Sequence, residues 1–126
     1  MVTKPIVAKG TETRVVFDGT TITLHPDVIA RFRSKLRRAE GGNRVIPIDD
    51  VVTVELVAST MLLNGYLRFN LAEDDEDDRP ESRTGAAGVK LAARDPNAVT
   101  FSRYQAAAFR ALHDAVATAI ADRETR

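Results

Sequence analysis

The chain has 126 residues, of which 44% are hydrophobic and 29% are charged, and its formal net charge at pH 7 is zero. This length suffices for one hydrophobic core, so we expect a single domain over residues 1–126. The absence of cysteine excludes disulfides, thiol nucleophiles and cysteine-ligated metals. No apolar run approaches the roughly 18 residues of a membrane span. The first ten residues lack the apolar segment of a secretory signal, so we expect a cytoplasmic protein.

The zero net charge is the sum of segments of opposite sign. Residues 1–45 carry nine Lys and Arg against four Asp and Glu, residues 46–88 carry three against ten, and residues 89–126 carry six against four. Such asymmetry can mark a partner surface, although in most globular proteins it reflects solvated faces that neutralise one another.

The N-terminal part of the sequence predicts an arm followed by a β-hairpin. Residues 1–13 are mainly polar and are interrupted by Pro5 and Gly10, which is typical of an arm or a loose edge strand. Residues 14–17 and 21–25 are β-rich and are joined through Asp18-Gly19-Thr20. Asp-Gly between two such runs is a strong hairpin signal, because the turn favours positive φ.

A basic helix is predicted over residues 26–39. Pro26 suits the first helical position, and apolar residues then recur at helical spacing from Val28 to Leu36. The remaining faces of this helix are strongly basic, and Gly41-Gly42-Asn43 ends it. Its cationic side chains, joined by one arginine that follows the helix, are Arg31, Arg33, Lys35, Arg37, Arg38 and Arg44.

Three strands are predicted in the middle of the chain. Residues 44–48 form the first, with Pro47 at an edge or a strand end, and Asp49-Asp50 makes a corner. Residues 51–57 and 66–71 alternate apolar and polar side chains as half-buried strands do. Asn64-Gly65 between them is a second hairpin signal, so we expect these two strands to pair.

The composition changes abruptly at residue 73, where six consecutive acidic residues begin a segment that runs to residue 88. Six adjacent carboxylates cannot pack together, so we expect a flexible, solvated loop. The alternative is an arm that attracts calcium or a basic partner, although the spacing lacks the glycine and distal glutamate of an EF-hand loop. Residues 89–93 and 98–101 then predict a final hairpin around residues 94–97.

A long amphipathic helix over residues 102–123 closes the sequence. Phe109, Leu112, Val116 and Ile120 lie three and four residues apart and so form one apolar stripe. Ser102, followed three residues later by Gln105, predicts a capping box at its start. Because the upstream segments are mainly short strands with an apolar face to cover, this helix is the expected cover.

Two segments carry a resemblance to a known family, namely Asn64-Gly-Tyr-Leu-Arg-Phe69 and the stretch from Asn97 to Val116. They are similar to the "NGYIQF" and "NAVxFxxxQ…FxxLRDAI" patterns of the bacterial pleckstrin-homology-like (PH-like) domains of unknown function that commonly precede a short C-terminal oligomerisation (SHOCT) segment. The resemblance spans about residues 14–122. It implies an α+β fold, a bent and partly closed β-barrel of two near-orthogonal antiparallel sheets, capped by the C-terminal helix. It also implies a bacterial or phage origin. The helix predicted over residues 26–39 is an extra helix after the first hairpin of this fold. The run 73–78 is longer and more acidic than that position usually is in the family.

Catalysis is poorly supported by the sequence, and we expect no enzyme, no cofactor and no metal site. His25 and His113 have no evident partners for a triad or a metal site, and no glycine-rich phosphate loop is present. Asp49 and Asp50 are adjacent only in sequence, so we do not expect a general acid and base pair.

The sharper hypothesis is a non-catalytic interaction module. We expect it to bind a protein or peptide through a sheet edge, the basic helix or a groove beside the closing helix. The alternative is peripheral binding to anionic membrane lipid through the basic helix 26–39, and nucleic-acid binding comes third because no stacking aromatics accompany the charges. The sequence also leaves open whether the protein forms a homo-oligomer. The alternative without a binding role is that the basic flank of the helix is solvated and only neutralises part of the charge of the acidic loop.

Overall fold

Two antiparallel sheets and one long helix make up the structure, a computed structural model that describes residues 4–27, 43–72, 88–90, 92 and 95–124. The first sheet has the order β1-β2-β3-β4 and consists of β1 (Ile6–Lys9), β2 (Thr13–Phe17), β3 (Thr21–Pro26) and β4 (Arg44–Pro47). The second has the order β5-β6-β7 and consists of β5 (Val51–Val57), β6 (Gly65–Leu71) and β7 (Ala98–Phe101). The short 3-10 helix η1 (Ile48–Asp50) joins the sheets, and α3 (Ala106–Glu124) follows β7.

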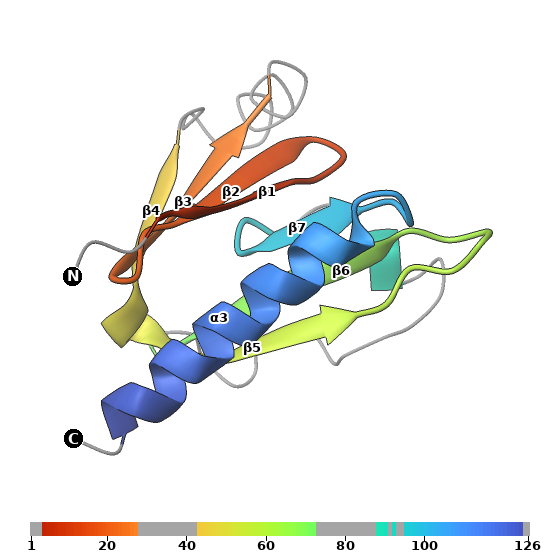
Figure 1. The fold of residues 1–126 in the computed structure, drawn as a ribbon. Helices are drawn as coiled ribbons and strands as arrows, with labels where there is room; N and C mark the ends of the chain where they lie inside the picture. Colours follow the sequence, from red (N-terminus) through yellow and green to blue (C-terminus); the bar gives the residue numbers. More distant parts are fainter. Residues whose placement is uncertain (1–3, 28–42, 73–87, 91, 93–94, 125–126) are drawn as a thin grey trace.

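The hydrophobic core lies between the two sheets and α3 (Figure 1). Alternate residues of each strand point into it, as the period of two in a strand requires. Its fully buried large side chains are Val15, Ile22, Ile46, Val51, Leu67, Phe69, Phe101, Phe109, Leu112 and Val116. The rings of Phe101 and Phe109 are stacked with their centroids 4.7 Å apart, which fixes the start of α3 against β7.

The closing helix is confirmed, although it starts later than predicted. The predicted apolar stripe, Phe109, Leu112, Val116 and Ile120, is the buried face of α3. The side-chain oxygen of Gln105 accepts the Ser102 N–H at 2.9 Å, which is the glutamine half of the predicted capping box. At the other end the guanidinium of Arg123 donates to the carbonyls of Ile48 and Val51 at 2.6 and 3.0 Å. Both ends of the helix are therefore tied to strands or to the turns beside them.

The first hairpin is confirmed and is stabilised by a side chain within its turn. β2 pairs with β3, and Gly19 between them has a φ of 103°. One oxygen of the Asp18 carboxylate accepts the N–H groups of Thr20 and Thr21 at 2.9 and 2.8 Å, and also the Thr20 hydroxyl at 3.0 Å. Glycine is needed here because other residues rarely adopt this positive φ.

The second hairpin is confirmed in its pairing and wrong in its turn. β5 pairs with β6, but Asn64-Gly65 does not form a two-residue turn, because Gly65 already belongs to β6 and pairs with Phe101 of β7. The connection is the longer loop 58–64. Gly65 is required for another reason: a Cβ there would lie 2.3 Å from the Val57 carbonyl oxygen. The glycine thus permits a close backbone approach.

The predicted strand over residues 89–93 is wrong. Residues 88–90 and 92 are helical, and β7 pairs with β6 instead of with this segment. The segment contains mostly good helix formers, Lys90, Leu91, Ala92 and Ala93, with Val89 as its one β-branched residue. Intrinsic helix propensity therefore favours the observed conformation.

Several predicted boundaries are also corrected. Residues 1–13, predicted as an arm or a loose edge strand, include the edge strand β1, which pairs along its length with β2. The predicted helix 26–39 does not start at Pro26, since that residue ends β3 opposite Thr13. The rest of that helix, and residues 73–87 of the predicted acidic loop, lie outside the described residues.

The predicted barrel is not closed. The described strands form two separate sheets, and α3 packs against β1 of one and β5 of the other. Figure 1 shows the helix lying along this opening, where strands would have to pair for a barrel to close. The fold is therefore α+β with the helix as one wall of the core. None of the helices in the described residues combines the length and apolar character that a membrane crossing needs.

Candidate functional site

Of the predicted basic site, only Arg44 lies within the described residues. Arg31, Arg33, Lys35, Arg37 and Arg38 lie outside the described residues, so their prediction stays a prediction. Arg44 is described: it begins β4, opposite Leu24 of β3, and its Nε is buried without a hydrogen-bond partner. The membrane and nucleic-acid hypotheses that rest on residues 26–39 likewise stay predictions.

The described residues form a groove beside the closing helix. It has a volume of about 460 Å³, within the roughly 300 to 1,000 Å³ typical of ligand pockets. It is open to solvent and runs between α3 and the start of the first sheet. Its lining residues are Lys4, Ile6, Phe17, Asp18, Gly19, Asp114, Ala115, Thr118, Ala119 and Asp122.

The floor of the groove is apolar, and small side chains leave the space. Ile6 lies opposite Phe17 in the β1-β2 ladder, so both side chains stand on the same face of the sheet. Ala115 and Ala119 face them from α3, four residues apart and hence on one side of the helix. Because an alanine side chain is a single methyl group, these two positions let α3 pack near β1 and still leave space for the groove.

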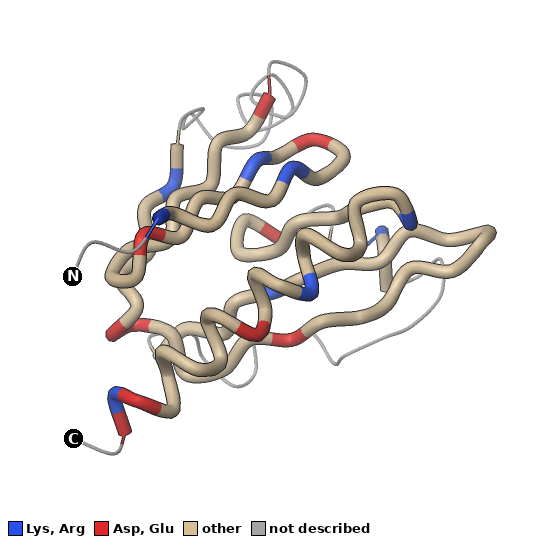
Figure 2. The backbone as a smooth tube through the Cα atoms, in the orientation of Figure 1, with Lys and Arg blue, Asp and Glu red and all other residues tan. Residues whose placement is uncertain are grey.

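The rim of the groove is acidic. Asp18 comes from the β2-β3 turn and Asp114 and Asp122 come from α3, against the single cation Lys4. The Asp114 carboxylate also lies 3.0 Å from Nδ1 of His113. Figure 2 shows that acidic residues gather towards the end of the molecule that holds the C-terminus. The rim therefore favours a positively charged ligand.

Sequence reasoning anticipated a groove beside this helix but not its residues. The lining comes from segments about a hundred positions apart in the chain, and their proximity depends on how α3 crosses the first sheet. One signal was available: Asp114, Thr118 and Asp122 are spaced by four and so share one helix face.

The pKa of the Asp18 carboxyl on the rim is lowered by hydrogen bonds within its own turn. Hydrogen bonds from the Thr20 N–H, the Thr21 N–H and the Thr20 hydroxyl hold its pKa below the usual 3.8. A lowered pKa stabilises the fold above the unfolded-state pKa, and that contribution is lost as the pH falls through the folded-state pKa.

Asp18→Asn is therefore expected to lower the urea midpoint at neutral pH. The difference from wild type should stay constant down to about pH 5 and narrow below 3.8, as the wild-type carboxyl becomes protonated. Urea titrations between pH 7 and pH 2 would measure this difference. A gap that widens on acidification would contradict the assignment.

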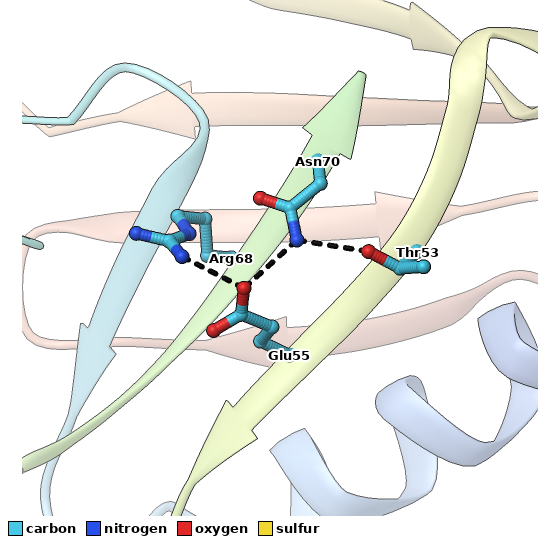
Figure 3. Close-up of polar contacts among 4 residues, drawn as sticks. All are labelled: Thr53, Glu55, Arg68 and Asn70. Carbon is cyan, nitrogen blue, oxygen red and sulfur yellow. Dashed lines mark hydrogen bonds and ion pairs between the residues drawn. The ribbon is translucent and has the colours of Figure 1, made fainter. Parts of the chain in front are cut away.

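A second polar cluster lies on the outer face of the second sheet (Figure 3). Arg68 Nη2 donates to Glu55 Oε1 at 2.7 Å, and Asn70 Nδ2 donates to the same oxygen at 2.9 Å and to Thr53 Oγ1 at 2.8 Å. The Arg68 side chain is only 7% exposed and that of Glu55 26%. The four residues stand in direct cross-strand pairs of β5 and β6. The cluster thus fixes the register of these strands, and we assign it a structural role.

The remaining candidates for chemistry lie apart. His25 is near the end of β3, His113 is on α3, and Asp49 and Asp50 are in η1. Within residues 4–27, 43–72, 88–90, 92 and 95–124, no three His, Asp or Glu side chains are grouped so that they could hold a metal ion.

Comparison with known proteins identifies the family of this chain. The model of a family described as a domain of unknown function (DUF4429) matches residues 15–117, which include all the strands from β3 to β7 and most of α3. No curated protein and no solved structure matches the chain. Because the match covers most of the 126 residues, this chain belongs to the DUF4429 family of domains of unknown function.

Proposed function

We propose that this domain is a non-catalytic interaction module of PH-like type that binds a short peptide segment of a partner protein in the groove beside α3. The observation that carries the proposal is the groove itself, with an apolar floor and three carboxylates on its rim. Apolar surroundings with a few charged groups that fix orientation are characteristic of ligand sites. The order of elements, two antiparallel sheets followed by a C-terminal helix, supports the PH-like relationship.

The composition of the groove defines the chemistry of the peptide. An apolar side chain of the peptide would lie on Ile6, Phe17 and the two α3 alanines. A lysine or arginine beside it would meet the carboxylates of Asp114 and Asp122, with Lys4 as the one opposing cation. Charge-assisted hydrogen bonds to these carboxylates would favour arginine, whose planar fork matches them.

A groove-filling substitution tests the proposal. Thr118 lines the groove and is exposed, so Thr118→Trp should fill the groove without disturbing the core. Peptides selected from a random displayed library against the wild-type protein are expected to combine apolar and basic residues and to bind Thr118→Trp at least about tenfold more weakly, a loss of about 1.4 kcal/mol. Isothermal titration with the synthetic peptides would measure the difference.

Ala111→Trp is the matched control, because it introduces the same side chain at an exposed position of α3 outside the groove. It should bind the selected peptides as the wild type does. Asp114→Lys should weaken basic peptides selectively. Equal affinity of Thr118→Trp and wild type, or a selection that yields no peptide, would overturn the proposal.

A further inference from the structure

Three turns meet at the end of the molecule opposite the acidic groove. The β1-β2 turn reaches β7, because the Thr11 N–H donates to the Thr100 carbonyl at 2.9 Å. A Cβ at Gly10 would lie 2.5 Å from the same oxygen, so this contact requires glycine. The β7-α3 turn is tied to the β1-β2 turn as well, since Gln105 Nε2 donates to the Gly10 carbonyl at 3.1 Å.

The third connection at this end is the β5-β6 loop. Gly65, which begins β6 directly after the loop, pairs with Phe101, which ends β7. The loop 58–64 therefore enters β6 at the same end of the sheet at which the turn 102–105 leaves the neighbouring strand β7. Figure 1 shows the β1-β2, β5-β6 and β7-α3 connections on one side of the molecule, with the β5-β6 loop projecting farthest.

The tip of the β5-β6 loop is apolar and has a defined turn. The Thr60 N–H donates to the Leu63 carbonyl at 2.8 Å, and Thr60 Oγ1 accepts the N–H groups of Leu62 and Leu63 at 3.3 and 3.0 Å. These bonds hold Met61 and Leu62 outward, 81% and 94% exposed. Two large, adjacent and exposed apolar side chains on one projecting turn are typical of a surface that binds a membrane or another protein.

An aromatic residue and cations accompany this tip. Tyr104 in the β7-α3 turn is 83% exposed, and the guanidinium carbon of Arg103 lies 4.8 Å from the centroid of its ring. Lys9 and Arg14 are exposed and lie opposite each other in the β1-β2 ladder. Glu12 is the acid within this turn. Figure 2 shows basic residues near the β1-β2 turn and the start of α3, away from the acidic end.

We infer that this end of the domain docks on an anionic lipid bilayer, with Met61 and Leu62 inserted at the interface and Arg103, Lys9 and Arg14 facing the headgroups. A projecting apolar tip beside cations and an exposed tyrosine matches the layered chemistry of the interface, which is apolar below, aromatic at headgroup level and negatively charged at the surface. A flat protein surface would not accommodate a projecting tip in this way. The inference does not rest on the peptide groove, which lies at the other end.

Vesicle sedimentation tests the inference. The wild-type protein should sediment with vesicles of phosphatidylcholine and phosphatidylserine and much less with phosphatidylcholine alone, and added salt should weaken binding. The double substitution Met61→Ser and Leu62→Ser should weaken binding about tenfold or more. Arg103→Glu removes a cation worth about fivefold and adds a repulsive charge, so its loss should exceed fivefold.

Val45→Ser is the matched control, since Val45 is an exposed apolar residue on β4 rather than on this loop. It should bind anionic vesicles as the wild type does. Absence of wild-type binding would overturn the inference. Undiminished binding by the double variant would also overturn it, and would place any lipid contact in the basic residues 31–38 or elsewhere.

A fluorescent reporter gives a second, direct readout, because the chain contains no tryptophan. Leu62→Trp places a single indole at the loop tip, and its emission should shift to shorter wavelength when anionic vesicles are added. Thr118→Trp, in the groove at the other end, should not shift. A reporter at position 62 that stays in water while the protein sediments with vesicles would contradict the proposed orientation.

Discussion

Phe109→Ala is expected to lower the free energy of unfolding by about 3 to 5 kcal/mol, the cost of removing a large aromatic side chain from a packed core. Phe109 is fully buried, and its ring stacks on that of Phe101 with an angle of 10° between the planes. Its loss would leave a cavity where α3 meets β7. Because small domains have a total stability of only about 5 to 15 kcal/mol, the variant should be close to unfolding at room temperature.

Urea denaturation followed by circular dichroism measures this effect. Arg110→Ala is the matched control, since Arg110 is the next residue of α3 and is exposed. The control should unfold within about 0.5 kcal/mol of the wild type. A Phe109→Ala midpoint close to the wild-type value would show that α3 does not close the core at this position.

Glu55→Ala is expected to cost about 3 kcal/mol, the low end of the range for removing one partner of a buried ion pair. Without Glu55 the Arg68 guanidinium would remain buried with no carboxylate within reach in the cluster, and its Nε already lacks a hydrogen-bond partner. Arg68→Met should cost less. Glu55 is more exposed, so after that change it could still be hydrated and accept the Asn70 amide.

A double-mutant cycle of Glu55→Ala and Arg68→Met, measured by urea denaturation, separates the interaction from the individual losses. The double variant should be more stable than Glu55→Ala alone, because it no longer buries an unpaired charge. Thr53→Val is the control: it removes the hydrogen bond at the exposed edge of the cluster and should change stability little. A larger cost for Arg68→Met than for Glu55→Ala would contradict this asymmetry.

The elements that could be predicted from the sequence are those specified by local pattern. The stripe of α3, the turn at Gly19 and the strands 51–57 and 98–101 follow from periodicity and turn chemistry within a few residues. The turn predicted at Gly65 is wrong because a tight turn and a close approach to Val57 across the sheet both require glycine. The residue type alone therefore does not distinguish the two.

The parts that could not be predicted depend on contacts between distant segments. β6 alternates polar and apolar residues like a half-buried strand, yet both of its faces are buried. Arg68 and Asn70 are tolerated on the polar face because they have hydrogen-bond partners on β5. The groove likewise exists only where α3 crosses the first sheet. The sequence pattern shows which residues share a face of α3, but not which element that face will meet.

The two bonds from Arg123 to the carbonyls of Ile48 and Val51 have a consequence for how the chain folds as it is made. They join residues more than seventy positions apart, and the stripe of α3 packs on strands that were synthesised long before it. The part of the core that α3 covers therefore remains exposed until α3 has emerged from the ribosome. Contacts of such long sequence separation make folding slow and leave apolar surface exposed in the nascent chain. The closing helix sets not only the stability of this domain but also the earliest moment at which it can be native.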